Sequence, residues 1–189
     1  MPDFFEVLKG RRSVRVYSDQ PVTDQELEDL VEAAILAPNA MNQQVWRFSV
    51  VTNRHTLSDV DARIKEILHE QDIAGKMKME GLKAALNSPD FSIFYHAPAL
   101  IVITADKGNP SAMLDCNLAM ENIFLAAHAQ GLGTCYMGFL FFGRDDAKVR
   151  QMLHIPEGHD IMAACCVGHS KMTPEGPPKR NPPQVEWVR

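Results

Sequence analysis

Apolar side chains recur at helical spacing in several stretches of this chain. The clearest stretch follows the capping box Thr23-Asp24-Gln25-Glu26, after which apolar residues lie three or four positions apart until Pro38 ends the helix. A shorter helix begins after its cap, Asp3, and stops at Gly10. The same spacing predicts a helix at 56–68, opened by Thr56. Further helices are predicted at 111–130, near 145–153 and over the mixed residues 71–92.

Four other stretches have the pattern of β-strands. Trp46, Phe48 and Val50 alternate with their neighbours, which indicates a strand with one buried face. Residues 97–105 are apolar almost without a break, as expected for a strand that is covered on both faces. Further strands are predicted at 134–137 and 161–167. The order of these elements describes one domain of the layered α/β type, with helices packed on a central sheet.

One predicted helix lacks a polar face. Asn109-Pro110 supplies its cap and first turn, and it ends before Gly131. Between 118 and 129 only three positions are polar, so this part must be buried on several sides. Its partner is either the core of the same chain or a second subunit.

The end of the chain has a different composition. From Met172 onward five prolines exclude a regular helix, and two cations, Lys179 and Arg180, lie among them. A solvated tail is the simplest interpretation of those cations. Trp187 and Val188 are unusual on a free end, so we expect the tail to lie extended on a surface, that of the neighbouring subunit.

Composition narrows the classes of function. The 189 residues carry a net charge of −5, which argues against nucleic-acid binding because phosphate neutralisation needs a basic surface. The four cysteines lie in apolar surroundings without C-x-x-C spacing, as buried thiols do. The first residues do not resemble a signal peptide, and no apolar run reaches membrane-spanning length. We therefore expect a cytoplasmic protein.

A basic segment, Lys9-Gly10-Arg11-Arg12-Ser13-Val14-Arg15, follows the first helix. Guanidinium groups present a planar set of donors that suits a phosphate dianion, and serine adds a short donor. A solvated basic turn is an equally good interpretation of this segment alone.

Two further segments suit a flat ligand. Asn39, Asn42, Gln43 and Gln44 crowd the loop before Trp46, and carboxamides both donate and accept hydrogen bonds, although Asn is also common in turns. The second segment, 130–138, ends in Gly138, which permits close approach of backbone to a ligand. Its Gly-x-Gly follows a helix and precedes a strand, which is the reverse of a dinucleotide-binding fingerprint.

The seven histidines show no spacing typical of metal ligands, and no hydrolase signature is present. The sequence therefore predicts no metal site.

Taken in order, these segments resemble the nitroreductase family of FMN-dependent oxidoreductases. The resemblance spans nearly the whole chain, through R-R-S-x-R at 11–15, P-x-x-x-N-x-Q-x-W at 38–46, G-L-G-T-C-x-M-G at 131–138 and the basic, proline-rich tail. It implies an α+β fold: a three-layer α/β/α sandwich with a central, mainly antiparallel sheet. It also implies a homodimer that exchanges terminal segments and holds two FMN molecules at its interface. Residues 1–171 would form the FMN-binding domain and 172–189 a tail that wraps the partner subunit.

The resemblance assigns FMN contacts to particular positions. Residues 11–15 would hold the phosphate, the ribityl chain and the polar edge of the flavin, and the tail cations would add to the phosphate site. Residues 38–44 would come from the other subunit, and 137–138 would lie beside the central ring. The residues so assigned are Arg11, Arg12, Ser13, Arg15, Pro38, Asn39, Asn42, Gln44, Met137, Gly138, Lys179 and Arg180.

Three positions depart from the family pattern, and they leave the preferred substrate open. Asn39 stands where serine is usual, Val45 where proline is usual, and Met137 where some relatives carry an acidic residue. Residues 71–96 match least, and no contact is assigned to them.

By this resemblance NADH or NADPH would reduce the flavin, and a small acceptor such as a nitroaromatic, a quinone or a flavin would then reoxidise it in a ping-pong mechanism. Guanidinium groups would stabilise the anionic reduced flavin. Such a mechanism needs no acid or base from the protein, so the resemblance implies no catalytic side chain. Two alternatives stay open: an FMN-storing module without turnover, and a dehalogenase-like or flavin-destructase-like branch of the same fold.

Overall fold

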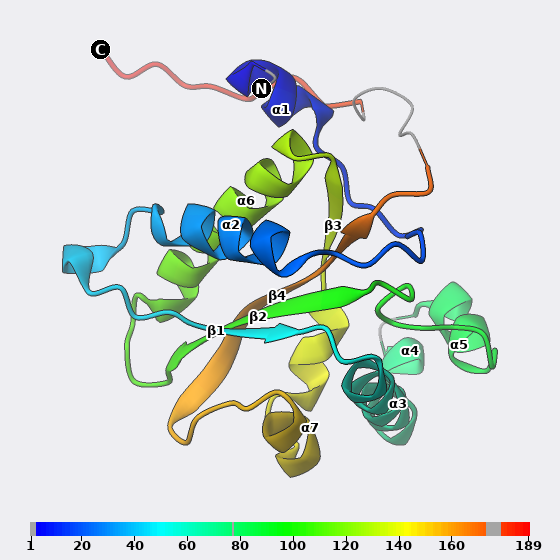
Figure 1. The fold of residues 1–189 in the computed structure, drawn as a ribbon. Coiled ribbons are helices and arrows are strands. Elements are labelled where there is room, and N and C mark those ends of the chain that lie inside the picture. Colours follow the sequence, from blue (N-terminus) through cyan, green and yellow to red (C-terminus); the bar gives the residue numbers. More distant parts are fainter. Residues whose placement is uncertain (1–2, 77, 173–178) are drawn as a thin grey trace.

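In the structure, a computed structural model, residues 3–76, 78–172 and 179–189 are described, and the described strands form one antiparallel sheet. Its order is β1-β2-β4-β3, as Figure 1 shows. The two central strands are those with continuous apolar sequence, and both are buried along nearly their whole length. The strands are β1 (Arg47–Val51), β2 (Ala99–Asp106), β3 (Leu132–Tyr136) and β4 (His159–His169).

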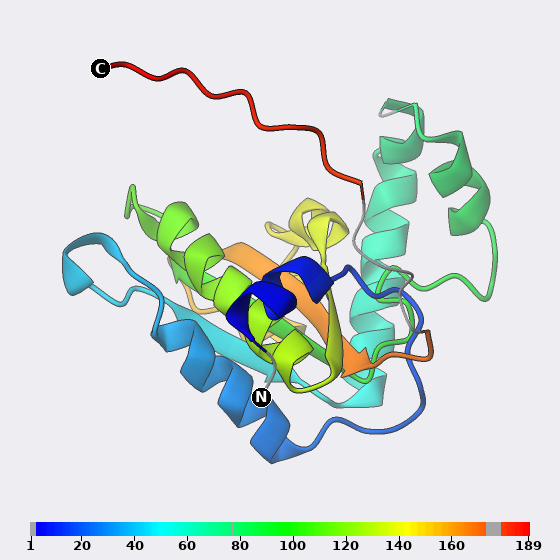
Figure 2. The same cartoon turned by 90° about the horizontal axis from the view of Figure 1, so that it is seen from above.

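Helices cover both faces of the sheet. On one face α2 (Asp24–Ile35) and α6 (Ala112–Ala129) lie side by side and enclose a core that includes Leu30, Ile101 and Ile123 (Figure 2). On the other face α3 (Arg54–Glu70), the 3-10 helix η2 (Gly138–Gly143) and α7 (Ala147–Met152) form a second core. The predicted three-layer α/β/α sandwich with an antiparallel sheet is thus confirmed.

Four smaller helices complete the described fold. The first, α1 (Phe4–Gly10), packs near the C-terminal end of α6. The 3-10 helix η1 (Ala40–Asn42) lies in the loop between α2 and β1. The third and fourth, α4 (Ile73–Lys76) and α5 (Glu80–Leu86), follow α3, so the helical prediction for 71–92 is correct for these two segments and wrong after residue 86.

Local signals placed several helix ends correctly. Asp3 and Thr23 both form capping boxes with the glutamate three residues later. Gly131, with φ at +81°, lets the chain leave α6 in the left-handed conformation that favours glycine.

Two predicted helix starts were wrong. The N-cap of α3 is Asn53, whose Oδ1 accepts hydrogen bonds from the N–H groups of His55 and Thr56 at 2.9 and 3.1 Å. Asn109 does not cap α6: its Oδ1 accepts from the Ser111 N–H at 2.9 Å in a turn, and the helix begins at Ala112. Both segments contain more than one good capping residue, and packing against the sheet selects between them.

The predicted strands were placed correctly but with different bounds. β3 begins at Leu132, two residues early, and ends at Tyr136, so Met137 lies just outside it. β4 extends beyond its apolar run at both ends because it pairs with β2 on one side and with β3 on the other.

Among the described residues, exposed apolar side chains include some on α6 and some near the end of the chain. One side of α6 packs into the core, but Leu114 and Leu118 on another side are 68% and 47% exposed. In the extended segment 179–189, Trp187 and Val188 are 76% and 93% exposed. The four cysteines are buried and free, as predicted.

Among the residues that the structure describes, no helix is both long enough and apolar enough to cross a membrane.

Candidate functional site

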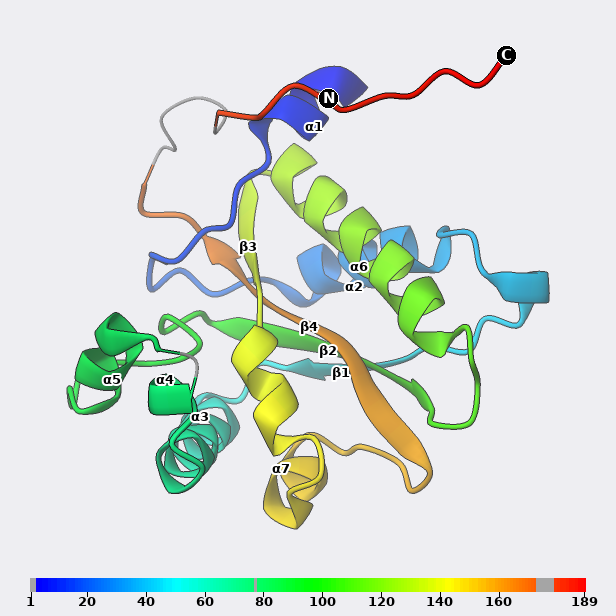
Figure 3. The ribbon, with the colours of Figure 1, turned by 180° about the vertical axis from the view of Figure 1, so that it is seen from behind.

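After α1, residues 11–17 run along strand β3, and we call this segment the basic strap (Figure 3). The Val14 N–H donates to the Thr134 carbonyl at 2.8 Å. Ser13 and Thr134 form an isolated parallel β-bridge. Tyr17 is buried, and its hydroxyl donates to the Val14 carbonyl at 2.7 Å. These bonds hold the cations of the strap along one edge of the sheet.

Gly133 permits this contact because it has no side chain. A Cβ at position 133 would lie 2.7 to 2.9 Å from three side-chain carbons of Val14, which is closer than carbon atoms approach in proteins. The strap lies tightly on β3 only because that strand carries a glycine here.

Replacing Gly133 by alanine should push the strap away from β3. Overpacking of this kind typically lowers the free energy of unfolding by about 1–3 kcal/mol. FMN binding should weaken in parallel, if the strap carries ligand contacts. Urea unfolding and an FMN titration measure the two effects. Gly81→Ala is the control for the glycine-to-alanine change itself. Gly81 lies in helix α5, and a Cβ at this position would meet nothing within 4 Å. A Gly133→Ala protein as stable as the wild type would refute this packing.

The beginning of the strap forms a positive cluster near the C-terminal end of α6. The Arg11 Nε lies 3.7 Å from Glu121 Oε1, and its guanidinium lies 5.8 Å from the ring centre of Phe124. The Arg12 Nη1 donates to the Lys9 carbonyl at 2.7 Å and also to the Arg11 carbonyl. Burial, together with the charges of Arg12 and Arg11, lowers the pKa of His128. This end of the strap therefore favours an anion.

Further along, Arg15 reaches a cavity of about 340 Å³ beside the end of β3. Met137 and Gly138 line the same cavity, so three predicted site residues meet there. A Cβ at Gly138 would meet nothing within 4 Å, which leaves open space beside its backbone. The remaining lining residues are mostly apolar or aromatic: Ile93, Tyr95, Cys135, Tyr136, Phe139 and Phe142.

The polar groups that act on Arg15 include the thiol of Cys135 and the phenol of Tyr95. The Cys135 thiol, as the main cause, and the phenol of Tyr95 raise the pKa of Arg15 against the opposing effect of burial. Burial raises the pKa of Cys135, which favours the neutral thiol, and Arg15 offsets part of that effect. The cavity thus combines an apolar lining with one permanent positive charge.

The amide-rich loop 38–44 is held in an unusual conformation at the other end of α6. Asn42 and Gln44 have φ of +55° and +49°, in the left-handed region. The Gln44 N–H donates to Asn39 Oδ1 at 2.9 Å, and the Ala40 N–H donates to the buried carboxylate of Asp115 at 3.2 Å. The loop is therefore anchored to the first turn of α6.

Within a single chain, the loop 38–44 lies far from the basic strap. The loop is tied to Asp115, whereas the strap begins beside His128, about 13 residues later on α6. At about 1.5 Å per residue the two anchors are roughly 20 Å apart. Figures 1 and 3 show the loop and α1 at opposite ends of this helix. Pro38, Asn39, Asn42 and Gln44 thus lie apart from Arg15, Met137 and Gly138 within the chain.

Lys179 and Arg180 are exposed in the extended segment 179–189. Their assignment to a phosphate site stays a prediction, as does docking of the tail on a neighbour; residues 173–178 lie outside the described part.

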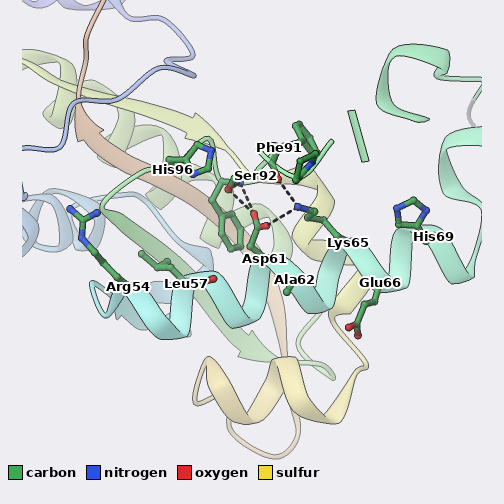
Figure 4. A pocket seen from close by; sticks show the side chains of 13 residues that line it. Arg54, Leu57, Asp61, Ala62, Lys65, Glu66, His69, Phe91, Ser92 and His96 are labelled. Carbon is green, nitrogen blue, oxygen red and sulfur yellow. Dashed lines mark hydrogen bonds and ion pairs between the residues drawn. The ribbon is translucent and has the colours of Figure 1, made fainter. Parts of the chain in front are cut away.

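A second cavity, of about 570 Å³, lies between α3 and residues 89–96 (Figure 4). Its buried carboxylate, Asp61, accepts from the Ser92 hydroxyl at 2.7 Å and lies 3.7 Å from Lys65 Nζ. Lys65 also donates to the Phe91 carbonyl at 2.5 Å. These polar groups bind one another and fix the turn that follows Pro89.

Sequence reasoning missed Tyr95, which lines the cavity next to Arg15. The sequence signal at this point is a group of aromatic residues directly before β2. That signal does not separate Phe94, which is buried in the core, from Tyr95, which faces the cavity.

Comparison with known proteins shows the family of the chain. The sequence profile of the nitroreductase family matches residues 8–169. A protein of Archaeoglobus fulgidus, provisionally named NADH dehydrogenase/NAD(P)H nitroreductase, is 31% identical over 176 residues, covering 90% of this chain and 87% of its own. The 4-nitrobenzoate reductase of Nocardioides sp. strain LMS-CY is 28% identical, covering 88% of this chain and 80% of its own. The crystal structure of a nitroreductase with bound FMN from Bacteroides fragilis superposes with a TM-score of 0.85 at 28% identity, over 99% of this chain and 100% of that one.

Proposed function

Because the chain belongs to the nitroreductase family, we propose that it binds FMN and passes electrons from NADH or NADPH to a small organic acceptor. The observation that carries the proposal is the cavity in which Arg15, Met137 and Gly138 meet. The FMN-bound relative from Bacteroides fragilis, which matches 99% of the chain, supports the choice of cofactor.

The residues of the cavity fit a flavin. The open space beside Gly138 suits a flat ring, and aromatic side chains such as Phe139 and Phe142 offer it apolar contacts. Arg15 would lie at the polar edge of the ring. From there the strap leads back to Ser13, Arg12 and Arg11, where the positive cluster suits the phosphate dianion.

When bound, FMN supplies the redox chemistry: it accepts two electrons from the nicotinamide donor and gives them to the acceptor. The chain orients the cofactor and keeps water from the ring with its apolar lining. Arg15 keeps its positive charge beside the ring and so favours the anionic reduced form. Donor and acceptor would use the same open side of the cavity in turn, as a ping-pong mechanism requires, and we assign no proton transfer to a side chain.

The complete site would need two subunits. The loop 38–44 lies far from the strap of its own chain, so a second copy would supply it. Leu114 and Leu118 form an apolar surface on α6 that such a dimer would cover. The tail from residue 172 would wrap the partner, bury Trp187 and Val188, and bring Lys179 and Arg180 to the phosphate.

The visible spectrum of the purified protein tests the function. We expect a yellow protein that bleaches under anaerobic NADH or NADPH and regains its colour when 4-nitrobenzoate or a quinone is added. A yellow protein that never bleaches would indicate a storage module. Bleaching with chemical loss of the flavin would indicate the flavin-destructase-like branch. A colourless protein that cannot be reconstituted with FMN would exclude every flavin-based function.

A further inference from the structure

The turn at residues 91–96 contains two consecutive residues in an unfavourable backbone conformation. Tyr95 and His96 both have φ of +55°, in the left-handed region that residues with a Cβ rarely adopt. Such geometry persists only where the surroundings hold it, and it concentrates at functional sites. The contacts of this turn are therefore informative.

On one side, the turn is tied to helix α3 (Figure 4). Asp61 accepts hydrogen bonds from the Ser92 hydroxyl at 2.7 Å and from the Phe94 N–H at 3.4 Å. Lys65, one helical turn later, donates to the Phe91 carbonyl at 2.5 Å. A buried carboxylate and a lysine on α3 thus fix the backbone just before Tyr95.

On the other side, the turn presents Tyr95 to the proposed flavin site. Tyr95 lines the cavity of about 340 Å³ together with Arg15 and Gly138. It also lines a neighbouring cavity of about 480 Å³, again with Arg15. Its side chain therefore forms part of the wall between the two cavities, beside the strap.

Tyr95 is well placed to direct Arg15. The guanidinium carbon of Arg15 lies 5.9 Å from the centre of the Tyr95 ring, within the range of cation–π attraction. In the described part of the chain no ion pair with a carboxylate fixes Arg15. A long, flexible side chain without such a partner takes its direction from the groups that pack on it.

We propose that Tyr95 is a positioning residue whose ring holds the Arg15 guanidinium at the polar edge of the flavin, and that Asp61 fixes the turn which presents it. The proposal rests on the proposed function. Tyr95 acts through Arg15, and the contact raises the affinity of the site for reduced FMN relative to oxidised FMN.

The reduction potential of bound FMN, measured by spectroelectrochemical titration, is the first test. In Tyr95→Leu the ratio of affinities for reduced and oxidised FMN should fall about tenfold, which lowers a two-electron potential by about 30 mV. Tyr95→Phe keeps the ring and loses only the phenol hydroxyl, so its potential should stay much closer to that of the wild type than to that of Tyr95→Leu. Asp61 does not line the cavity of about 340 Å³, yet Asp61→Asn should shift the potential in the same direction as Tyr95→Leu. Glu66→Gln, on the same helix, should leave the potential unchanged.

A double-mutant cycle separates positioning from general damage. If Tyr95 acts through Arg15, adding Tyr95→Leu to an Arg15→Met protein should change the potential no further. Additive shifts, or an unchanged potential in Tyr95→Leu alone, would overturn the proposal. Either outcome leaves the binding of FMN, and hence the proposed function, intact.

The contact is also measurable without cofactor. In the FMN-free protein the Tyr95 ring should shift the NMR signal of the Arg15 Nε–H upfield, and the shift should vanish in Tyr95→Leu and remain in Tyr95→Phe. Loss of this pattern would overturn the positioning role, whether or not the protein binds FMN. Failure of the wild type to bind FMN, with the pattern present, would instead defeat the proposed function.

Discussion

Replacing both Leu114 and Leu118 by aspartate is expected to give folded monomers that no longer retain FMN. Both leucines are largely exposed on a single chain, so neither carboxylate would be buried in the core of a monomer. Fully burying a leucine side chain is worth about 1.5–3 kcal/mol. A symmetric dimer would cover both leucines of each subunit, and each is already partly covered in the single chain, so their loss removes at least about 4 kcal/mol from association. That corresponds to roughly a thousandfold increase in the dimer dissociation constant, before any desolvation of the new charges is added.

FMN retention should fall with assembly because the loop 38–44 would no longer reach the strap of another chain. Sedimentation velocity at micromolar concentration and the flavin content of the same sample measure the two effects. Ala62→Asp, an exposed position on α3, is the control for adding a carboxylate to a helix surface. A double variant that stays dimeric would remove this surface of α6 from the interface. A monomer that retains FMN would contradict the shared site.

Replacing Arg11 or Arg12 by alanine should weaken the binding of FMN while leaving riboflavin binding unchanged. A charge-assisted contact to the phosphate contributes about 1.5–3 kcal/mol. The loss in FMN affinity should therefore be roughly 10- to 150-fold. Riboflavin lacks the phosphate, so it reports whether the rest of the site is intact.

Two further variants sharpen this test. Glu121 lies 3.7 Å from Arg11 in the structure, so Glu121→Gln should leave Arg11 more available and maintain or increase FMN affinity. Lys107→Ala is the control for losing a cation elsewhere. Lys107 pairs with Asp145 away from the strap, so this variant should change FMN affinity little. Isothermal titration with both ligands compares the series. Equal losses for FMN and riboflavin would show that the basic strap is structural, and no loss in either arginine variant would refute the phosphate site.

Most elements of this fold could be predicted from local sequence because their signals are strong and short in range. The nearly continuous apolar runs of β2 and β4 indicated strands covered on both faces, and these two strands are central in the sheet. The capping boxes at Asp3 and Thr23 bond only within their own first turns, so no distant contact can move them. The family motifs also singled out Arg15, Met137 and Gly138, which meet in one cavity.

Where two residues could each cap a helix, local sequence did not decide at which of them the helix begins. Asn53 and Thr56 are both good capping residues, and they lie three positions apart. The structure begins α3 directly after β1 ends at Val51, whose register against Leu100 is set by the sheet. Propensity alone does not choose between the two residues, because the choice depends on a strand that lies some 50 residues away in the sequence.

The sequence by itself thus determined which segments form helices and strands, and which of them carry donors suited to a phosphate and a flat ring. Only the tertiary structure decided that the strap lies on β3, that the loop 38–44 lies at the far end of α6, and that Tyr95 meets Arg15. Each of these facts depends on contacts between segments tens of residues apart. Such contacts follow from strand order, from the absence of a side chain at Gly133 and from the bonds of Asp61, and no local pattern of apolar and polar residues encodes them.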